Sequence, residues 1–277
     1  MNLENIKDGE LKEVFDALED TFKDNAIDFY MIGAIARNIW YAKGDEKFRT
    51  TKDVDFAVMI ASREDYQKVR DDLFKKGYTE SSTNAFVVIS PTGLQVDLLP
   101  FGAIEIDEEV KFEGQGLTSI KVNGFQEVYS MGTEDVTLDT GHQFKIATLP
   151  AIVLLKFIAY DDRPELRFKD ARDIINIIEH YFNLQSDFIY ENHADLFGGE
   201  DEDITLEEIS GKVIGREIKK MIKENAGLGA RLNRIILEHL GLMEKSALIR
   251  NMVNESGKKD VEEIVAILKV MLNHLKD

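Results

Sequence analysis

Two segments that alternate like β-strands carry aspartates at positions where strands seldom have them. Asp53 and Asp55 lie in Thr-Lys-Asp-Val-Asp-Phe-Ala-Val, and Asp97 lies in Leu-Gln-Val-Asp-Leu-Leu. Side chains two positions apart on a strand share a face, so the first two carboxylates lie about 6–7 Å apart on one side. Val54 and Phe56 point to the other side, into a core. The pattern predicts a sheet with one apolar face and one acidic face.

The three carboxylates point to metal chemistry if the two strands are neighbours. Strands disfavour aspartate, and like charges on one face destabilise a sheet unless cations bind between them. Two divalent metal ions held by carboxylates are what nucleotidyl transfer requires. We therefore interpret Asp53, Asp55 and Asp97 as metal ligands and catalytic residues. The alternative interpretation is an exposed edge strand with a polar face.

The composition is that of a soluble globular protein. The chain has 277 residues, of which 44% are hydrophobic and 31% charged, which suits one large domain or two ordinary ones. Lys156 interrupts the apolar stretch Ala151–Tyr160, so no membrane span is expected. No secretory signal is visible, which favours a cytoplasmic location. The chain has no cysteine, which excludes disulfides, thiolate metal sites and a cysteine nucleophile.

The net charge of −18 argues against broad, nonspecific binding of nucleic acid, which depends on the neutralisation of phosphates. One segment departs from this acidity, because Gly211–Arg234 holds seven lysines and arginines against two glutamates. This basic segment predicts a docking face, either for RNA, such as a tRNA end, or for an acidic partner. The alternative, which we favour, is ordinary solvated helices whose cations balance the acidic segment Gly198–Glu208.

The hydrophobic pattern predicts an α+β domain over residues 1–148 and a helical domain over 149–277. Proline suits the first turn of a helix, so Leu149-Pro150 marks the change. Three helical stretches are expected after the acidic loop at Gly198–Asp203. Before that loop, helices are predicted over 11–22, 34–41, 62–76, 151–160 and about 165–182, and strands over 27–32, 54–60, 85–89, 94–99 and 104–145.

Gly33 stands at a predicted strand-to-helix junction, Met31-Ile32-Gly33-Ala34. A glycine there lets the backbone approach a ligand, and the N–H groups at the start of the helix attract phosphate. Such a junction alone is more often a tight turn. The strand with Asp53 follows 20 residues later (53 minus 33), and this order favours phosphate binding.

This arrangement resembles the DNA polymerase β-like nucleotidyltransferase superfamily, and more closely the AbiEii/AbiGii-type nucleotidyltransferase toxin family. The resemblance covers about residues 26–180 and implies a mixed β-sheet nucleotidyltransferase core flanked by helices, followed by an all-helical half. Residues 149–159 and 163–173 look like the family's lysine-bearing helix and its Lys-Asp-x-x-Asp signature. The other matching segments are 31–36, 49–56 and 96–97.

The resemblance implies a role for each matching residue of the first domain. Asp53 and Asp55 would bind two Mg²⁺ ions and the phosphates of a nucleoside triphosphate. Asp97 would hold the catalytic metal and help to deprotonate an attacking hydroxyl. Gly33 and the N–H of Ala34 would cradle phosphate oxygens, although the family usually has Gly-Gly or Gly-Ser there. Alanine keeps the backbone donor but limits close approach, which predicts weaker phosphate binding or a divergent substrate.

The helical half would add nucleotide contacts through Lys156, Arg163, Lys169 and Asp170. Lys156 would reach the triphosphate; the alternative is a lysine at the edge of the core with its charge in solvent. Asp170 and Asp173 share a helix face, so they would either orient Lys156 or Arg163 or form a plain interhelical ion pair.

Two functions fit these residues. The first is an Mg²⁺-dependent nucleotidyltransferase that moves a nucleoside monophosphate onto a hydroxyl of RNA, protein or a small molecule. If the resemblance extends to toxicity, an antitoxin-like partner would restrain it. The second is a non-catalytic nucleotide-binding or protein-interaction module on the same fold. Triphosphate binding without release of pyrophosphate would favour the second.

Overall fold

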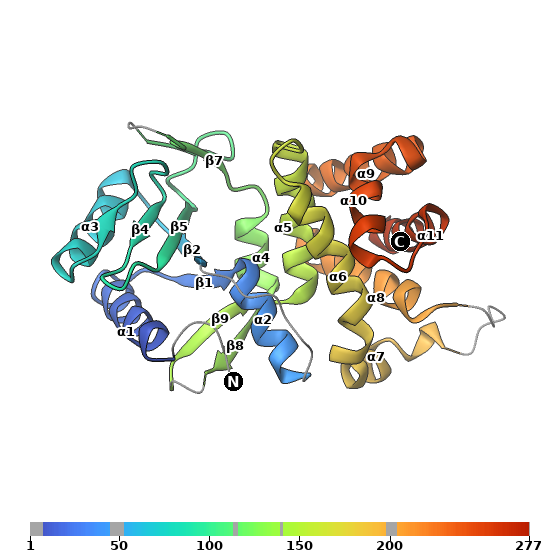
Figure 1. Ribbon diagram of the computed structural model, residues 1–277, viewed down its shortest axis with the longest axis horizontal. Coiled ribbons are helices and arrows are strands. Elements are labelled where there is room, and N and C mark those ends of the chain that lie inside the picture. Colours follow the sequence, from blue (N-terminus) through green and yellow to red (C-terminus); the bar gives the residue numbers. More distant parts are fainter. Residues whose placement is uncertain (1–7, 45–52, 113–115, 139–140, 198–203, 277) are drawn as a thin grey trace. The chain divides into compact units, whose positions relative to one another are not determined.

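The computed structural model describes residues 8–44, 53–112, 116–138, 141–197 and 204–276. The chain forms two compact units, Met1–Thr148 and Leu149–Asp277. The first unit is α+β, and the described part of the second is helical (Figure 1). No helix in these ranges is long and apolar enough to cross a membrane.

The described part of the first unit contains a mixed seven-stranded sheet in the order β3-β4-β5-β2-β1-β9-β8, while β6 and β7 pair separately. The predicted mixed sheet flanked by helices is therefore confirmed. Its helices are α1 (Asp8–Asp24), α2 (Gly33–Lys43), α3 (Arg63–Lys75) and α4 (Phe125–Met131). Its strands are β1 (Phe29–Ile32), β2 (Asp53–Met59), β3 (Thr79–Glu80), β4 (Val87–Ile89), β5 (Gln95–Phe101), β6 (Glu109–Lys111), β7 (Ser119–Lys121), β8 (Thr133–Thr137) and β9 (Gln143–Ala147).

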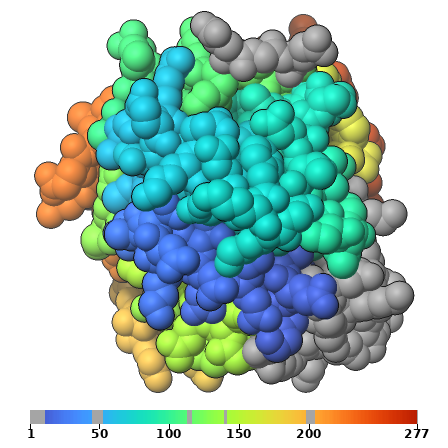
Figure 2. All heavy atoms as spheres, turned by 90° about the vertical axis from the view of Figure 1, so that its left-hand side faces the viewer, coloured from blue at the N-terminus to red at the C-terminus, as the bar shows by residue number. Residues whose placement is uncertain are grey.

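Helix α1 covers the apolar face of the sheet. Phe15 and Phe22 of α1 meet the ring of Phe56 on β2 edge-on, with centroids 6.4 and 6.1 Å apart. Helix α3 lies beside α1, and Figure 2 shows their surfaces adjoining in blue and cyan. The alternation of β2 places Phe56 on this face, so Asp53 and Asp55 point to the other one.

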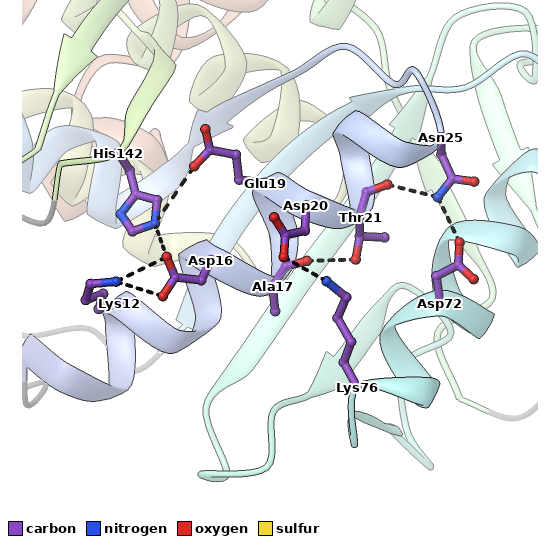
Figure 3. Close-up of polar contacts among 10 residues, drawn as sticks. All are labelled: Lys12, Asp16, Ala17, Glu19, Asp20, Thr21, Asn25, Asp72, Lys76 and His142. Carbon is purple, nitrogen blue, oxygen red and sulfur yellow. Dashed lines mark hydrogen bonds and ion pairs between the residues drawn. The ribbon is translucent and has the colours of Figure 1, made fainter.

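Polar contacts hold α1 at its middle and just past its C-terminal end (Figure 3). The Asn25 amide donates to Asp72 of α3 over 2.9 Å. At the middle of the helix, Nε2 of His142 lies 3.0 Å from the Asp16 carboxylate, and the imidazole stacks on the ring of Phe144. Helix α1 is thus tied to α3 and to the β8–β9 hairpin as well as to the apolar core.

Helix α4 corrects the prediction of strands alone between residues 104 and 145. It packs on the opposite face of the sheet, where the hydroxyl of Tyr30 donates to Phe125 O over 2.9 Å. The helix begins after Gly124, which has a φ of +90°, and buries Phe125 and Val128. Seven residues are too few to reveal a helical period in the sequence, and the flanking strands dominate the pattern.

The described part of the second unit is helical, as predicted. The acidic loop 198–203 lies outside the described residues, and four helices follow it instead of the three expected. Two of these helices begin after Asn225 and Ser246, whose side chains accept from the N–H groups of Leu228 and Ile249 and so cap them. The helices are α5 (Leu149–Asp162), α6 (Phe168–Leu184), α7 (Ser186–Asn192), α8 (Leu206–Ile222), α9 (Ala226–Leu242), α10 (Ala247–Ser256) and α11 (Val261–Lys276), with 3₁₀ turns η1 (Ala194–Leu196) and η2 (Met243–Lys245).

Two glycines bring α8 close to α11. A Cβ added at Gly215 would lie 2.5 Å from Met271 O, and one at Gly211 would lie 3.1 Å from Ile267 O. A Cβ does not fit at the first distance, so the two helix backbones approach through this small-residue seam. The core of the helical unit therefore depends on glycine at a helical position where alanine has the higher propensity.

Candidate active site

The register of two parallel strands brings the predicted metal ligands to one face of the sheet. β2 and β5 pair so that Asp55 lies directly opposite Asp97 and Asp53 lies opposite Gln95. Residues opposite each other in a ladder share a face, and alternation puts Asp53 on the same face as Asp55. Asp53 is exposed, whereas Asp55 and Asp97 are half-buried.

The start of α2 lies against this carboxylate face. Ile32 of β1 pairs with Asp55, and the next residue, Gly33, has a φ of +70° and begins the helix. A Cβ added at Gly33 would lie 2.2 Å from Oδ2 of Asp55, so only glycine leaves room for that carboxylate. Gly33 is therefore required by its backbone conformation and by its contact with Asp55. Ala34 follows as a half-buried residue in the first turn.

The donor chemistry of this face suits Mg²⁺, which prefers carboxylate oxygens. Within the described ranges, however, no three histidine, aspartate or glutamate side chains are arranged closely enough to hold a metal ion. Arg49, Thr50 and Thr51, which precede β2 in the matching segment, lie outside those ranges. The backbone thus aligns the carboxylates, and their role as metal ligands stays a prediction.

Tyr66 is a neighbour of the site that no sequence motif indicated. Its hydroxyl donates to Leu98 O over 2.8 Å, on the residue that follows Asp97. Burial raises the pKa of the Tyr66 phenol well above its ordinary value; the Arg70 guanidinium opposes this rise and the charge of Asp97 adds to it. The phenol therefore stays protonated and holds β5 as a donor. In the sequence Tyr66 is only one apolar position of an amphipathic helix.

Lys156 of α5 forms a buried ion triad with two aspartates of α6. Its Nζ lies 2.9 Å from Asp170 Oδ1 and 2.7 Å from Asp173 Oδ2, with only 14% of the side chain exposed. Burial alone would lower the pKa of Lys156, but the two carboxylates outweigh it and raise that pKa. The interhelical ion pair considered from the sequence is present. The predicted contact of Lys156 with a triphosphate is not tested by this geometry.

The other predicted nucleotide contacts of the helical unit lie around the α5–α6 junction. Arg163 follows α5, with its N–H donating to Ala159 O over 3.4 Å, and is half-buried. Lys169 is exposed in the first turn of α6. Asp170 is buried, and its Oδ2 has no hydrogen-bond partner among the described residues. Their roles in binding nucleotide stay predictions.

Some of the cations of the basic segment Gly211–Arg234 are held by carboxylates of neighbouring elements. The guanidinium of Arg216 pairs with Asp195 at 2.6 Å, and that of Arg231 pairs with Asp161 at 2.8 Å. These partners belong to η1 and to the end of α5. Of the acidic segment Gly198–Glu208, residues 198–203 lie outside the described residues, and Glu207 pairs with Lys259 at 2.9 Å. The expected balance by this segment therefore stays a prediction.

The solved structures that match this chain include two of the antibiotic-resistance factor ANT(2″)-Ia. One is a solution structure with 14% identity and a TM-score of 0.38, which covers 68% of this chain and 96% of that chain. The other is a crystal structure in complex with adenylyl-2″-tobramycin, with 14% identity, a TM-score of 0.39 and coverage of 68% and 94%. With TM-scores below 0.5, these two structures carry no argument about the function of this protein. A comparison with curated proteins found no match.

Comparison with protein families gives a match over most of the chain. The matching description is nucleotidyl transferase AbiEii toxin, type IV toxin–antitoxin system, over residues 16–232. The match spans the sheet with its aligned carboxylates, the Lys156 triad and part of the helical unit. The protein therefore belongs to the AbiEii nucleotidyl transferase toxin family.

Proposed function

We propose that this protein transfers a nucleoside monophosphate from a nucleoside triphosphate to a hydroxyl acceptor. The observation that carries the proposal is the register of β2 and β5, which sets Asp55 opposite Asp97 beside the start of α2. A sheet keeps like charges in direct opposition at a cost in stability, and functional sites are where such costs are expected. Family membership supplies the type of reaction.

In the proposed reaction, the acceptor oxygen attacks the α-phosphorus and the bond from that phosphorus to the pyrophosphate oxygen breaks. Asp97 takes the proton of the attacking hydroxyl, and pyrophosphate leaves with the electron pair of the broken bond. Asp53, Asp55 and Asp97 would hold Mg²⁺, which when bound neutralises charge on the phosphates. Gly33 and the N–H of Ala34 would position phosphate oxygens at the positive end of α2.

The helical unit would contribute binding rather than proton transfer. The raised pKa keeps Lys156 protonated, so its positive charge can attract a triphosphate. Asp170 and Asp173 pair with the same ammonium group, so a bound triphosphate would share that charge with them. Arg163 and Lys169 remain the other proposed nucleotide contacts. An antitoxin-like partner is proposed from the toxin–antitoxin description of the family.

The test is transfer of label from each α-labelled triphosphate in the presence of Mg²⁺, RNA and protein acceptors. We expect pyrophosphate release and a labelled acceptor with the parent protein and neither with Asp55→Asn. Asp135→Asn is the matched control, because Asp135 is an exposed strand aspartate on β8 of the same sheet. Equal activity of the parent and Asp55→Asn would overturn the proposal.

The second candidate is a non-catalytic nucleotide-binding or protein-interaction module, which the Gly33-Ala34 pair in place of Gly-Gly or Gly-Ser favours. It predicts Mg²⁺-dependent binding of a triphosphate without pyrophosphate. Calorimetric titration beside the transfer assay separates the two functions. An Ala34→Gly variant that gains transfer activity would identify the alanine as the cause of weak chemistry.

A further inference from the structure

Helix α7 and the turn η1 after it bring aromatic rings to the surface of the helical unit. Tyr190 of α7 is 56% exposed, and its ring stacks on that of Phe197 with the centroids 4.9 Å apart. We call the side chains of Asp187, Tyr190, Glu191 and Phe197 the α7 face. Apolar groups that gather on a surface with a charged rim mark a contact site, whereas scattered ones do not.

The exposed ring is held in place by other rings of its own unit. Phe182 of α6 lies edge-on to the ring of Tyr190, with the centroids 5.8 Å apart, and edge-on to that of Phe197 at 6.3 Å. Because the three rings fix one another, the outer side of Tyr190 can receive a ligand with little loss of side-chain entropy.

Two carboxylates border the exposed ring. Asp187, Tyr190 and Glu191 are spaced three and four positions apart on α7, so their side chains share one face of the helix. Both acids are exposed, and neither pairs with a cation of the described residues. Like charges four positions apart destabilise a helix, and a carboxylate in the last turn opposes the helix dipole. The placement of Glu191 therefore does not serve the stability of α7.

The surroundings supply no charge to balance these acids. The sequence has no lysine or arginine between Arg172 and Lys212. Two cations of α8 come near His193, which follows α7, but Asp195 and Glu217 hold them at 2.6 Å each. Burial lowers the pKa of His193, so this imidazole is neutral at neutral pH. The α7 face thus combines an aromatic ring with two uncompensated negative charges.

This combination fits a guanidinium group. A guanidinium is planar, so it stacks on an aromatic ring while its N–H groups donate to a carboxylate. The chain forms such an arrangement in its first unit. The guanidinium carbon of Arg70 lies 5.8 Å from the ring centroid of Tyr66, and its NH2 group donates to Glu80 over 3.2 Å. The α7 face has the tyrosine and the carboxylates of that arrangement, and the arginine must come from another molecule.

We propose that the α7 face binds an arginine-bearing segment of a partner protein, with one guanidinium stacked on Tyr190 and paired with Asp187 and Glu191. The occupant is a protein segment because the aromatic surface continues to Phe197, which one guanidinium cannot also cover. Nucleic acid is disfavoured, since its phosphates would meet two carboxylates. The proposal does not rest on the proposed nucleotidyl transfer.

The probe is a short labelled peptide in which arginine alternates with leucine, titrated with the full chain and followed by fluorescence anisotropy. Tyr190→Ala should weaken binding by about 3- to 30-fold, because a cation–π contact is lost, and Tyr190→Phe should bind like the parent. Glu191→Gln should weaken binding by about 2- to 5-fold and make it less sensitive to salt. A lysine version of the peptide should bind at least about 3-fold more weakly, since an ammonium group neither stacks nor pairs in a fork.

Two variants serve as matched controls and should bind the peptide like the parent. Phe168→Ala removes another exposed ring of the helical unit, over which the guanidinium carbon of Arg172 already lies at 5.7 Å from the centroid. Glu262→Gln makes the same charge change as Glu191→Gln at an exposed acid of α11. Melting curves check that each variant is folded.

The proposal is overturned if Tyr190→Ala and Phe168→Ala behave alike, or if the lysine peptide binds as tightly as the arginine peptide. Equal affinity for N-acetylarginine amide would assign the face to a small molecule instead. A concentration-dependent dimer that Tyr190→Ala abolishes would assign it to a second copy of this chain. Tyr190→Ala should keep the transfer activity of the parent, so that this proposal and the proposed function can fail separately.

Discussion

The two units arrange their aspartates in opposite ways. In the sheet unit, the backbone sets Asp55 directly against Asp97, so like charges face each other. In the helical unit, Asp170 and Asp173 close on Lys156 at 2.9 and 2.7 Å. The carboxylates of the helical unit are compensated by a buried lysine. Opposition of two aspartates across a ladder disfavours a sheet, and we attribute its presence here to the proposed chemistry.

The largest expected effect is on the rate of reaction. Asp97→Asn should lower nucleotidyl transfer by at least about 10³-fold, because it removes the proposed proton acceptor and a metal ligand. Its free energy of unfolding should stay equal or rise by up to about 1 kcal/mol, since a like-charge pair is relieved. Urea unfolding and single-turnover transfer measure the two quantities. A clear loss of stability would mean that the pair is structural, which would break the contrast between the units.

Lys156→Met should lower the free energy of unfolding, in contrast to Asp97→Asn. Removing the lysine leaves Asp170 and Asp173 facing each other in the core, and loss of one partner from a buried ion pair costs about 3–5 kcal/mol. Lys169→Met is the control, since this exposed lysine should change stability by less than about 0.5 kcal/mol. Similar urea midpoints for the two variants would show that Lys156 is held for a ligand rather than for the fold.

Substitutions at Gly33 and Gly215, the glycines with close neighbours in the two units, test the same comparison between the sheet unit and the helical unit. Gly215→Ala should lower stability by about 1–3 kcal/mol, because the new methyl group overlaps Met271 O of α11. It should leave triphosphate affinity unchanged. Gly33→Ala should lower both stability and affinity, since its methyl group displaces the Asp55 carboxylate. Thermal melting and calorimetric titration of both variants test whether the two effects separate in this way.

The smallest expected effect is on the loss of stability at acidic pH. Burial lowers the pKa of His193 from its ordinary 6.5; the nearby cations add to this, although Glu217 opposes it. The unfolded chain therefore takes up a proton at His193 more readily than the folded chain, and stability falls as pH drops below about 6.5. We expect the loss of Tm between about pH 7.5 and about pH 5.5 to be smaller in His193→Gln than in the parent. An unchanged loss would place the acid-sensitive groups elsewhere.

Local patterns predicted most elements of the fold but not the contacts between them. The helix predicted from residue 62 and the alternation of the strand that bears Asp97 were readable, and both appear in the structure, where the Ser62 side chain accepts from the N–H of Asp65. The pattern missed α4, which is too short to show a period, and one of the four helices that follow residue 203, where three were expected. The sequence did not distinguish Tyr66 from the other buried positions of its helix.

The candidate site was predictable as a set of residues but not as a geometry. Alternation fixed which face Asp55 occupies, yet its alignment with Asp97 depends on pairing between strands that are far apart in the sequence. The crowding of Asp55 against Gly33 has the same origin. Residues 49–52 of the matching segment 49–56 lie outside the described ranges. The metal and nucleotide roles therefore remain predictions.

The alignment of β2 with β5 also links site assembly to folding. A shift of one residue between these strands would turn Asp97 toward the phenylalanines of α1 and bring Val96 to the surface. Such a misaligned molecule would bury an unmatched charge and could not stay folded. Every molecule that folds should consequently hold its carboxylates correctly, so heat or denaturant should reduce the number of active molecules without producing a folded but inactive population.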